Sequence, residues 1–209
     1  MVEPREIAGM SAAMLRRMIG NKQLSPVELV DACIAWIEAL DPFENAMVAT
    51  NFDAARDAAR AAEKTVMRGE PLGLLHGLPT GVKDFEATAG LLTTQASPLY
   101  RDAVPQEDNL PVARLRAAGA IVVGKTNVPE LGAGANRRNP VRGATGNPFN
   151  PQSECGRLVG RLRPRRSRAT CLPVCTGSDA GVSLRIPAAL CGVVGFRPSC
   201  PTACVSLSK

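Results

Sequence analysis

Residues 109–124 constrain the fold of this chain more than any other stretch, because they place a helix, a glycine and a buried strand in direct succession. Residues 109–118 carry Val112, Leu115 and Ala118 on one side at helical spacing. Gly119 ends this helix, and the continuous apolar run AIVVG (120–124) is typical of a strand buried on both faces. Helix then strand, with glycine between them, predicts an α/β sheet. Two more short apolar runs, at 78–82 and 172–175, are candidate strands, and a helix is expected to begin at Ile186.

Residues 1–70 have a different pattern and predict helices. Ser25-Pro26-Val27-Glu28 is a capping box with proline at the first helical position. The helix that follows is expected to end at Asp41-Pro42, and its apolar face consists of Val30, Cys33, Ile34 and Ile37. A second, alanine-rich helix is predicted over 53–68, ended by Gly69.

The positive charge of the chain is confined to one segment. Lys and Arg number 25 against 19 Asp and Glu, a formal net charge of +6. Without the six arginines of residues 157–168 the two totals are equal, because 25 less 6 leaves 19. These six are Arg157, Arg161, Arg163, Arg165, Arg166 and Arg168. A basic surface can bind nucleic acid, but an excess that belongs to a single stretch leads us to expect no nucleic-acid partner.

Cysteine spacing and hydropathy exclude further classes. Seven cysteines without a disulfide framework predict free thiols in a reducing compartment. The pairs Cys171/Cys175 and Cys200/Cys204 lie in unlike contexts, with only His76 to assist them, so we expect no metal and no cofactor. The apolar runs are shorter than the ~18–20 residues that span a bilayer, and the polar N-terminus lacks the order of a signal peptide. We therefore expect a cytoplasmic protein without a membrane partner.

Three segments carry candidate functional residues. In GVKD (81–84), Lys83 stands at the end of an apolar strand, where burial disfavours the charged form of an amine and lets it act as a base. In GVSLRIP (181–187), small residues before Ser183 let backbone N–H groups face a substrate oxygen. Taken alone, a lysine that reaches solvent and a serine that caps a helix explain these two segments better. The third segment, 124–149, is a loop region dense in Gly, Asn and Pro, of a kind that is often functional.

Taken together, these segments resemble the amidase-signature family. The matching stretches are HGLPTGVKD (76–84), GAIVVGKTNVPELGAGAN (119–136), RNPVRGATGNPFNP (138–151) and TGSDAGVSLRIPAALCGVVGFRPS (176–199). The resemblance covers most of residues 5–151 and 172–199, and four ordered blocks with family-like spacing are a specific signal. It implies N-terminal helices followed by a mixed β-sheet flanked by helices, as an incomplete version of the family fold.

The resemblance also implies a chemistry, the hydrolysis of a small-molecule amide through an acyl-enzyme. Ser183 matches the family's nucleophile, and Lys83 matches its lysine, a neutral amine that takes the proton. The backbone N–H groups of Ala180, Gly181 and Val182 match the oxyanion hole. The family's second serine bridges these two residues from a cis peptide in a GGSSGG loop, and no residue here corresponds to it.

Residues 152–171 stand where that loop is expected, and they read QSECGRLVGRLRPRRSRATC. If GC-rich codons for residues 153–163 are shifted by one base, the same nucleotides can spell LNAGGSSGGSA. A frameshift therefore accounts for the arginines, while a genuine basic insert and a nucleic-acid-binding arm are the competing interpretations. We expect residues 153–171 to be irregular, because arginines without acidic partners repel one another.

Other departures predict a weakened enzyme. Val182 and Ala180 stand where the family usually has glycine and threonine, and a β-branched residue is strained if its position needs φ > 0. We interpret 1–209 as a single partial domain, with helical residues 1–70, an α/β core over 71–199, the aberrant segment 153–171 and an aberrant tail 200–209. The family domain is more than twice as long, so we expect the C-terminal half to be missing and turnover to be unmeasurable. The sequence leaves three hypotheses of function: an amidase, a non-catalytic relic of an amidase gene and, more distantly, a basic nucleic-acid-binding module.

Overall fold

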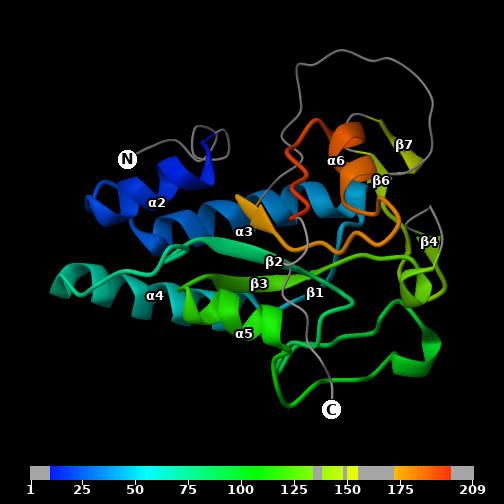
Figure 1. Cartoon of the computed structure of the whole chain (residues 1–209), viewed down its shortest axis with the longest axis horizontal. Helices are drawn as coiled ribbons and strands as arrows, with labels where there is room; N and C mark the ends of the chain where they lie inside the picture. Colours follow the sequence, from blue (N-terminus) through cyan, green and yellow to red (C-terminus); the bar gives the residue numbers. More distant parts are fainter. Residues whose placement is uncertain (1–9, 134–137, 148–149, 155–171, 199–209) are drawn as a thin grey trace.

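The structure is a computed structural model that describes residues 10–133, 138–147, 150–154 and 172–198, with only the backbone described at 150–154. A four-stranded sheet lies at its centre (Figure 1), in the order β1-β3-β2-β8. The strands are β1 (Met47–Thr50), β2 (Pro79–Lys83), β3 (Ile121–Thr126) and β8 (Val174–Cys175). β2 runs parallel to β3 and to β8, whereas β1 is antiparallel to β3. The mixed α/β sheet predicted from the sequence is therefore confirmed.

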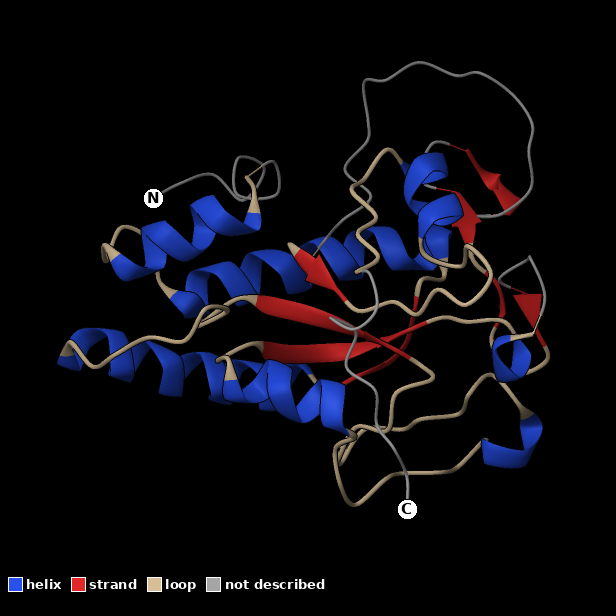
Figure 2. Cartoon of the chain, in the orientation of Figure 1, coloured by secondary structure: helices blue, strands red, loops and turns tan. Residues whose placement is uncertain are grey.

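Figure 2 shows how the helices surround this sheet. Their bounds are α2 (Ala12–Gly20), α3 (Pro26–Glu44), α4 (Phe52–Arg68), α5 (Leu110–Ala117) and α6 (Arg185–Cys191). Short 3-10 turns lie at Pro98–Tyr100 (η1) and Glu130–Gly132 (η2), and two small hairpins pair β4 (Arg138–Asn139) with β5 (Gly143–Ala144) and β6 (Gly146–Asn147) with β7 (Asn150–Glu154). None of the described helices combines the length and apolarity needed to cross a bilayer.

Alternate side chains of β3 bind the sheet to helices on both of its faces. Ile121 and Val123 join the buried side chains of α2, α3 and α4 in one hydrophobic cluster. Val122 belongs to a second cluster with Val82 of β2 and Val112 of α5. Because side chains of a strand point to opposite faces in turn, the run AIVVG is buried on both sides, as predicted. Gly119, at φ 89°, makes the turn from α5 into β3, and an added Cβ there would lie 2.8 Å from the Cα of His76.

The capping box at Ser25 and Glu28 forms as predicted, and the predicted apolar face of α3 is buried. The predicted end of this helix is wrong, because α3 continues through Pro42 to Glu44. A proline in the last turn forfeits one hydrogen bond, and Asp41 compensates: its carbonyl accepts from the Asn45 N–H, and its carboxylate accepts from the N–H groups of Ala46 and Met47 at 2.7 and 2.8 Å. That turn leads directly into β1, a strand inside the region that was predicted to be helical.

Candidate active site

Lys83 is the last residue of β2, at the strand end where the sequence predicted it. Its backbone N–H donates to Thr176 Oγ1 at 2.8 Å, and its amine donates to Ser178 Oγ at 2.6 Å. Thr176 and Ser178 follow β8, which is parallel to β2. Since parallel strands end at the same edge of a sheet, the topology brings the loop after β8 to Lys83.

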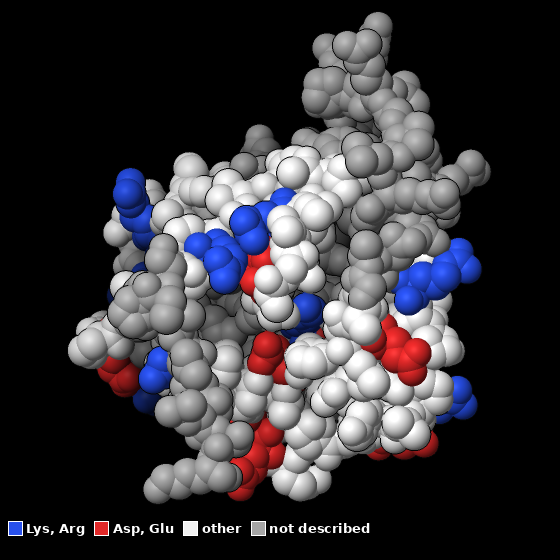
Figure 3. Space-filling model, turned by 45° about the vertical axis from the view of Figure 1, so that its right-hand side comes forward, with Lys and Arg blue, Asp and Glu red and all other residues white. Residues whose placement is uncertain are grey.

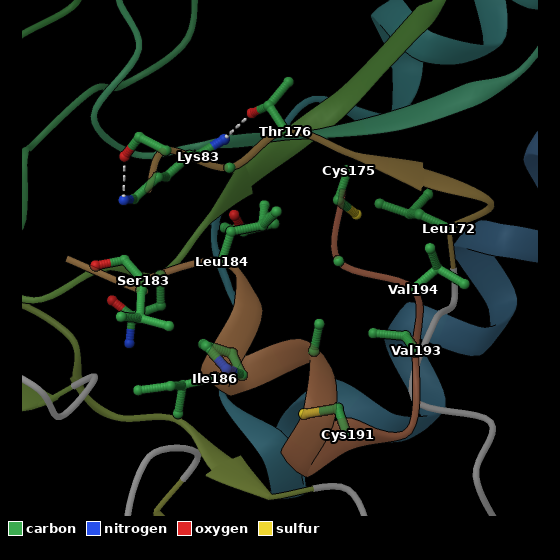
Figure 4. Close-up of a pocket in the computed structure, with 18 of the residues that line it drawn as sticks. Lys83, Leu172, Cys175, Thr176, Ser183, Leu184, Ile186, Cys191, Val193 and Val194 are labelled. Carbon is green, nitrogen blue, oxygen red and sulfur yellow. Dashed lines mark hydrogen bonds between the residues drawn. The ribbon is translucent and has the colours of Figure 1, made fainter. Parts of the chain in front are cut away.

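Ser183 lies in the turn that precedes α6, and its side chain is exposed. It lines a cavity of about 640 Å³ that Lys83 also lines (Figure 4). The structure thus brings together the two side chains that the sequence singled out, from opposite ends of the α/β region. On the other side of Figure 4 the cavity wall is apolar, with Leu172, Val193 and Val194. Among the described lining residues, Lys83 alone carries a charged side chain.

Asp179 holds the loop between β8 and α6 in place. Its buried carboxylate accepts the backbone N–H of Val182 at 2.7 Å and that of Arg185 at 3.3 Å. The guanidinium of Arg185 adds two contacts, from Nε at 2.8 Å and from a terminal nitrogen at 3.1 Å. Arg185 holds the pKa of the Asp179 carboxyl well below its usual range, and the two backbone N–H groups assist it. The ion pair of Asp179 with Arg185, here called the clamp, therefore stays charged at neutral pH.

The clamp changes the predicted oxyanion hole. The Val182 N–H, one of the three expected donors, is directed to Asp179 and away from the cavity in this structure. The reason is electrostatic, since an ionised carboxylate fixed by Arg185 is a stronger acceptor than a neutral carbonyl. The N–H groups of Ala180 and Gly181, the two other predicted donors, have no acceptor among the described residues. Of these two residues, only Gly181 is among the described residues that line the cavity.

Val182 has a positive φ of 67°, the backbone conformation that the sequence analysis named as a source of strain for a β-branched residue. This left-handed region favours glycine and is costly for a β-branched residue, because Cβ approaches the following carbonyl oxygen. The strain lies one residue before Ser183, and the bond from Val182 N–H to Asp179 helps to maintain it.

Replacing Val182 by glycine should therefore stabilise the protein. We expect Val182→Gly to raise the free energy of unfolding by about 1 kcal/mol, the left-handed strain less the extra entropy of an unfolded glycine. Urea denaturation followed by circular dichroism measures the change. Val194→Gly is the matched control, because Val194 is 95% exposed and lacks a positive φ, and it should be neutral or destabilising. Equal destabilisation by both substitutions would show that Val182 is not strained.

A buried charged cluster lies directly behind Lys83. Lys125 of β3 is fully buried, and its amine donates to the Glu86 carbonyl and, at 2.9 Å, to Thr88 Oγ1. Asp84, also fully buried, accepts from the N–H and hydroxyl of Thr94 at 3.0 and 2.6 Å. Burial raises the pKa of Asp84 and lowers the pKa of Lys125 to about 8. This cluster fixes the chain that leaves β2 and hence the base of the Lys83 side chain.

Sequence reasoning did not assign a role to Thr176, Ser178, Asp179, Asp84 or Lys125. Charged residues beside apolar strands, in VKD and GKT, were the available signal for Asp84 and Lys125. The segment 153–171 was predicted to be irregular and to replace the bridging-serine loop. Its residues 155–171 lie outside the described residues, as does the tail 200–209, while residues 153–154 belong to β7. Among the side chains that the structure describes, no group of three or more His, Cys, Asp or Glu residues could hold a metal ion.

The chain matches a known family along most of its length. The family model described as Amidase matches residues 28–157 and 169–204. The gap between the two matched parts falls inside the arginine segment. The second matched part extends beyond Ser199, the residue at which the family resemblance was predicted to end. It therefore includes the start of the tail that was interpreted as aberrant.

Curated relatives include the glutamyl-tRNA(Gln) amidotransferase subunits A of Thermosynechococcus vestitus and Rhodopirellula baltica. Both are 36% identical to this chain, over 185 and 189 residues that cover 88% and 90% of it. This chain spans 38% of the length of each of these relatives.

Solved structures of enzymes resemble the described fold as well. A bacterial aryl acylamidase of the amidase-signature family superposes with a TM-score of 0.74 and 34% identity, over 86% of this chain and 37% of that enzyme. A 6-aminohexanoate cyclic dimer hydrolase, solved with its substrate, gives a TM-score of 0.74 and 30% identity, over 88% of this chain and 36% of that enzyme.

Proposed function

This chain belongs to the amidase family, and from that membership we propose that it hydrolyses a carboxylic amide to an acid and ammonia or an amine, through an acyl-enzyme on Ser183. One observation carries the proposal to these residues. Lys83 and Ser183 line one cavity together with Gly181, whose backbone N–H has no protein acceptor among the described residues.

The Ser183 hydroxyl attacks the amide carbon, its proton passes toward the neutral amine of Lys83, and the carbonyl oxygen becomes an oxyanion. The N–H groups of Ala180 and Gly181 stabilise that oxyanion. When the C–N bond breaks, the leaving nitrogen takes the proton back, and water then releases the acid from Ser183 by the same steps in reverse order.

The substrate is proposed to be a small neutral amide. The described cavity wall supports this, since it mixes apolar and uncharged polar side chains and has no charged side chain besides Lys83. We propose no nucleic-acid partner and a cytoplasmic location. On the face shown in Figure 3, the basic and acidic side chains of the described residues are interspersed.

Ammonia release from a panel of aliphatic and aromatic primary amides tests the proposal. From the sequence we expect this release to be impaired and even unmeasurable; release that does occur should disappear in Ser183→Ala and persist in Thr65→Ala, which removes a hydroxyl from α4. We expect Val182→Gly to raise the rate, because relief of strain frees the loop to adapt to the oxyanion. Release that survives in Ser183→Ala would exclude Ser183 as the nucleophile.

A non-catalytic relic of an amidase is the second candidate. Two observations favour it: Val182 is strained, and its N–H is directed to Asp179 and not to the cavity. The loss of one oxyanion donor costs about 10²–10³-fold in rate. If neither the chain nor Val182→Gly releases ammonia from any amide of the panel, this second candidate is the better account.

A further inference from the structure

The amine of Lys83 lies over the aromatic ring of Phe85, with 5.9 Å between Nζ and the ring centroid. The face of an aromatic ring carries partial negative charge, so it attracts an ammonium group that lies within about 6 Å of the centroid. This attraction favours the protonated amine over the neutral one. Because Phe85 is not among the described residues that line the cavity, its contact with the site is through Lys83.

The ring of Phe85 is held beside the amine by two features of the fold. Phe85 lies in the turn that follows β2, and a bond from the Glu86 N–H to the Lys83 carbonyl closes this turn at 3.0 Å. The ring also packs beside Gly132 of η2, where an added Cβ would lie 3.4 Å from Cε2 of the ring. The aromatic face is therefore in place before any substrate binds, and such preorganisation favours an efficient reaction.

The acidic side chains nearest to Lys83 in sequence are held by other residues. The carboxylate of Asp84 accepts from the N–H and the hydroxyl of Thr94, and that of Glu86 accepts from the side-chain amide of Asn109. Both carboxylates thus have hydrogen bonds of their own, and the contact of the amine with the aromatic ring is separate from them.

We propose that Phe85 is a positioning residue for Lys83: its ring holds the amine at the cavity and stabilises the ammonium that forms when the amine takes the Ser183 proton. This inference rests on the proposed function. Since the ring is 40% exposed, we expect it to favour the ammonium by about 2–5-fold, the range for exposed contacts of this kind. Two effects of opposite sign follow for Phe85→Leu. The neutral amine should persist to lower pH, whereas proton transfer at high pH should become slower, because the ammonium that it forms is less stable.

NMR of the lysine side chains tests the contact without a need for turnover. The chain has five lysines, so carbon-13 at lysine Cε gives few signals, and Lys83→Met identifies the signal of Lys83. We expect the ring current of Phe85 to shift this signal, and the shift to disappear in Phe85→Leu. The pH of half-titration of the amine should fall by roughly half a unit in Phe85→Leu. Phe85→Trp keeps an aromatic face and should retain both effects. Phe43→Leu is the matched control, because Phe43 is 72% exposed on α3, and it should change neither.

The rate at which Ser183 reacts with an ethyl fluorophosphonate tests the catalytic consequence. The reaction forms a bond from Ser183 Oγ to phosphorus, releases fluoride and transfers the serine proton to the base. At high pH, where the rate is at its plateau, we expect Phe85→Leu to react about 2–5-fold more slowly than the unmodified chain and Phe85→Trp to stay within about twofold of it. Intact-mass spectrometry at timed intervals gives the rates.

The pH dependence separates an effect on the amine from mere support of the fold. A ring that only supported the fold would change the folded fraction and leave the pH of half-maximal labelling unaltered, whereas we expect this pH to fall in Phe85→Leu and not in Phe85→Trp. Equal titration of Lys83 in the chain and in Phe85→Leu would overturn the inference and leave the proposed function standing, as would equal changes in Phe85→Leu and Phe85→Trp. If the unmodified chain is not labelled at Ser183 at all, the proposed function fails, and the catalytic role of Phe85 fails with it, whatever the NMR signals show.

Discussion

Replacing Lys83 by methionine is expected to slow amide hydrolysis nearly as much as replacing Ser183 by alanine, on the order of 10⁴-fold, because a nucleophile and its base act as a unit. Without the amine, the described part of the cavity wall offers the serine proton only hydroxyl groups, the Asn127 amide and the thiols of Cys175 and Cys191, all weaker bases than a neutral amine. Methionine retains the length of the side chain. The bond from the Lys83 backbone N–H to Thr176 does not depend on the side chain and should remain.

The ratio kcat/KM for ammonia release measures this effect. Lys64→Met is the matched control, because Lys64 lies exposed on α4, and its kcat/KM should equal that of the unmodified chain. Lys83 is not the base if Lys83→Met retains more than about a tenth of the activity while Ser183→Ala abolishes it. The role that the family resemblance implies for this residue would then be wrong.

Replacing Lys125 by methionine is expected to produce the largest loss of stability among the single substitutions considered. We expect the free energy of unfolding to fall by about 3 kcal/mol, as is typical when one member of a buried charged group is removed. The Glu86 carbonyl and the Thr88 hydroxyl lose their donor, and Asp84 loses its nearest buried positive charge. Urea denaturation measures the loss, and the exposed Lys64→Met should stay within about 0.5 kcal/mol of the unmodified chain.

The pH dependence of stability offers a second signature of Lys125. Its pKa is about 8 in the folded chain, against 10.5 as the ordinary value, because burial disfavours the charged amine. Between these two values the unfolded chain binds more protons than the folded chain, so the stability contributed by this group rises with pH across the window. Lys125→Met should lack that rise. Identical pH profiles for the two proteins between pH 8 and pH 10.5 would contradict the assignment.

The parts of the fold that the sequence predicted well are those with strong local signals. The periodic face of α3, the capping box at Ser25 and the run AIVVG of β3 all formed, since their local pattern and their tertiary packing agree. β1 was missed because its four residues become a strand only by pairing with β3, a contact distant in sequence. The strand expected at 172–175 is reduced to Val174–Cys175, because Pro173 has no N–H to donate to a ladder.

The site was predictable to a similar degree. Family motifs pointed to Lys83 and Ser183, and the sheet topology explains why two segments so far apart in sequence reach one cavity. Side-chain contacts within the loop after β8 were beyond sequence reasoning. That Asp179 would take the Val182 N–H, or that Ser178 would meet the amine of Lys83, depends on the direction of single side chains, which residue spacing does not encode.

The central claim is that Ser183 is a nucleophile activated through Lys83, and mapping a covalent adduct tests it most directly. The chain is incubated with the ethyl fluorophosphonate, digested with trypsin and sequenced by tandem mass spectrometry. We predict one adduct on Ser183, absent from Ser183→Ala and strongly reduced in Lys83→Met, with none on the other serines. An adduct that forms on another residue, or that reaches the same level on Ser183 without Lys83, would contradict the account.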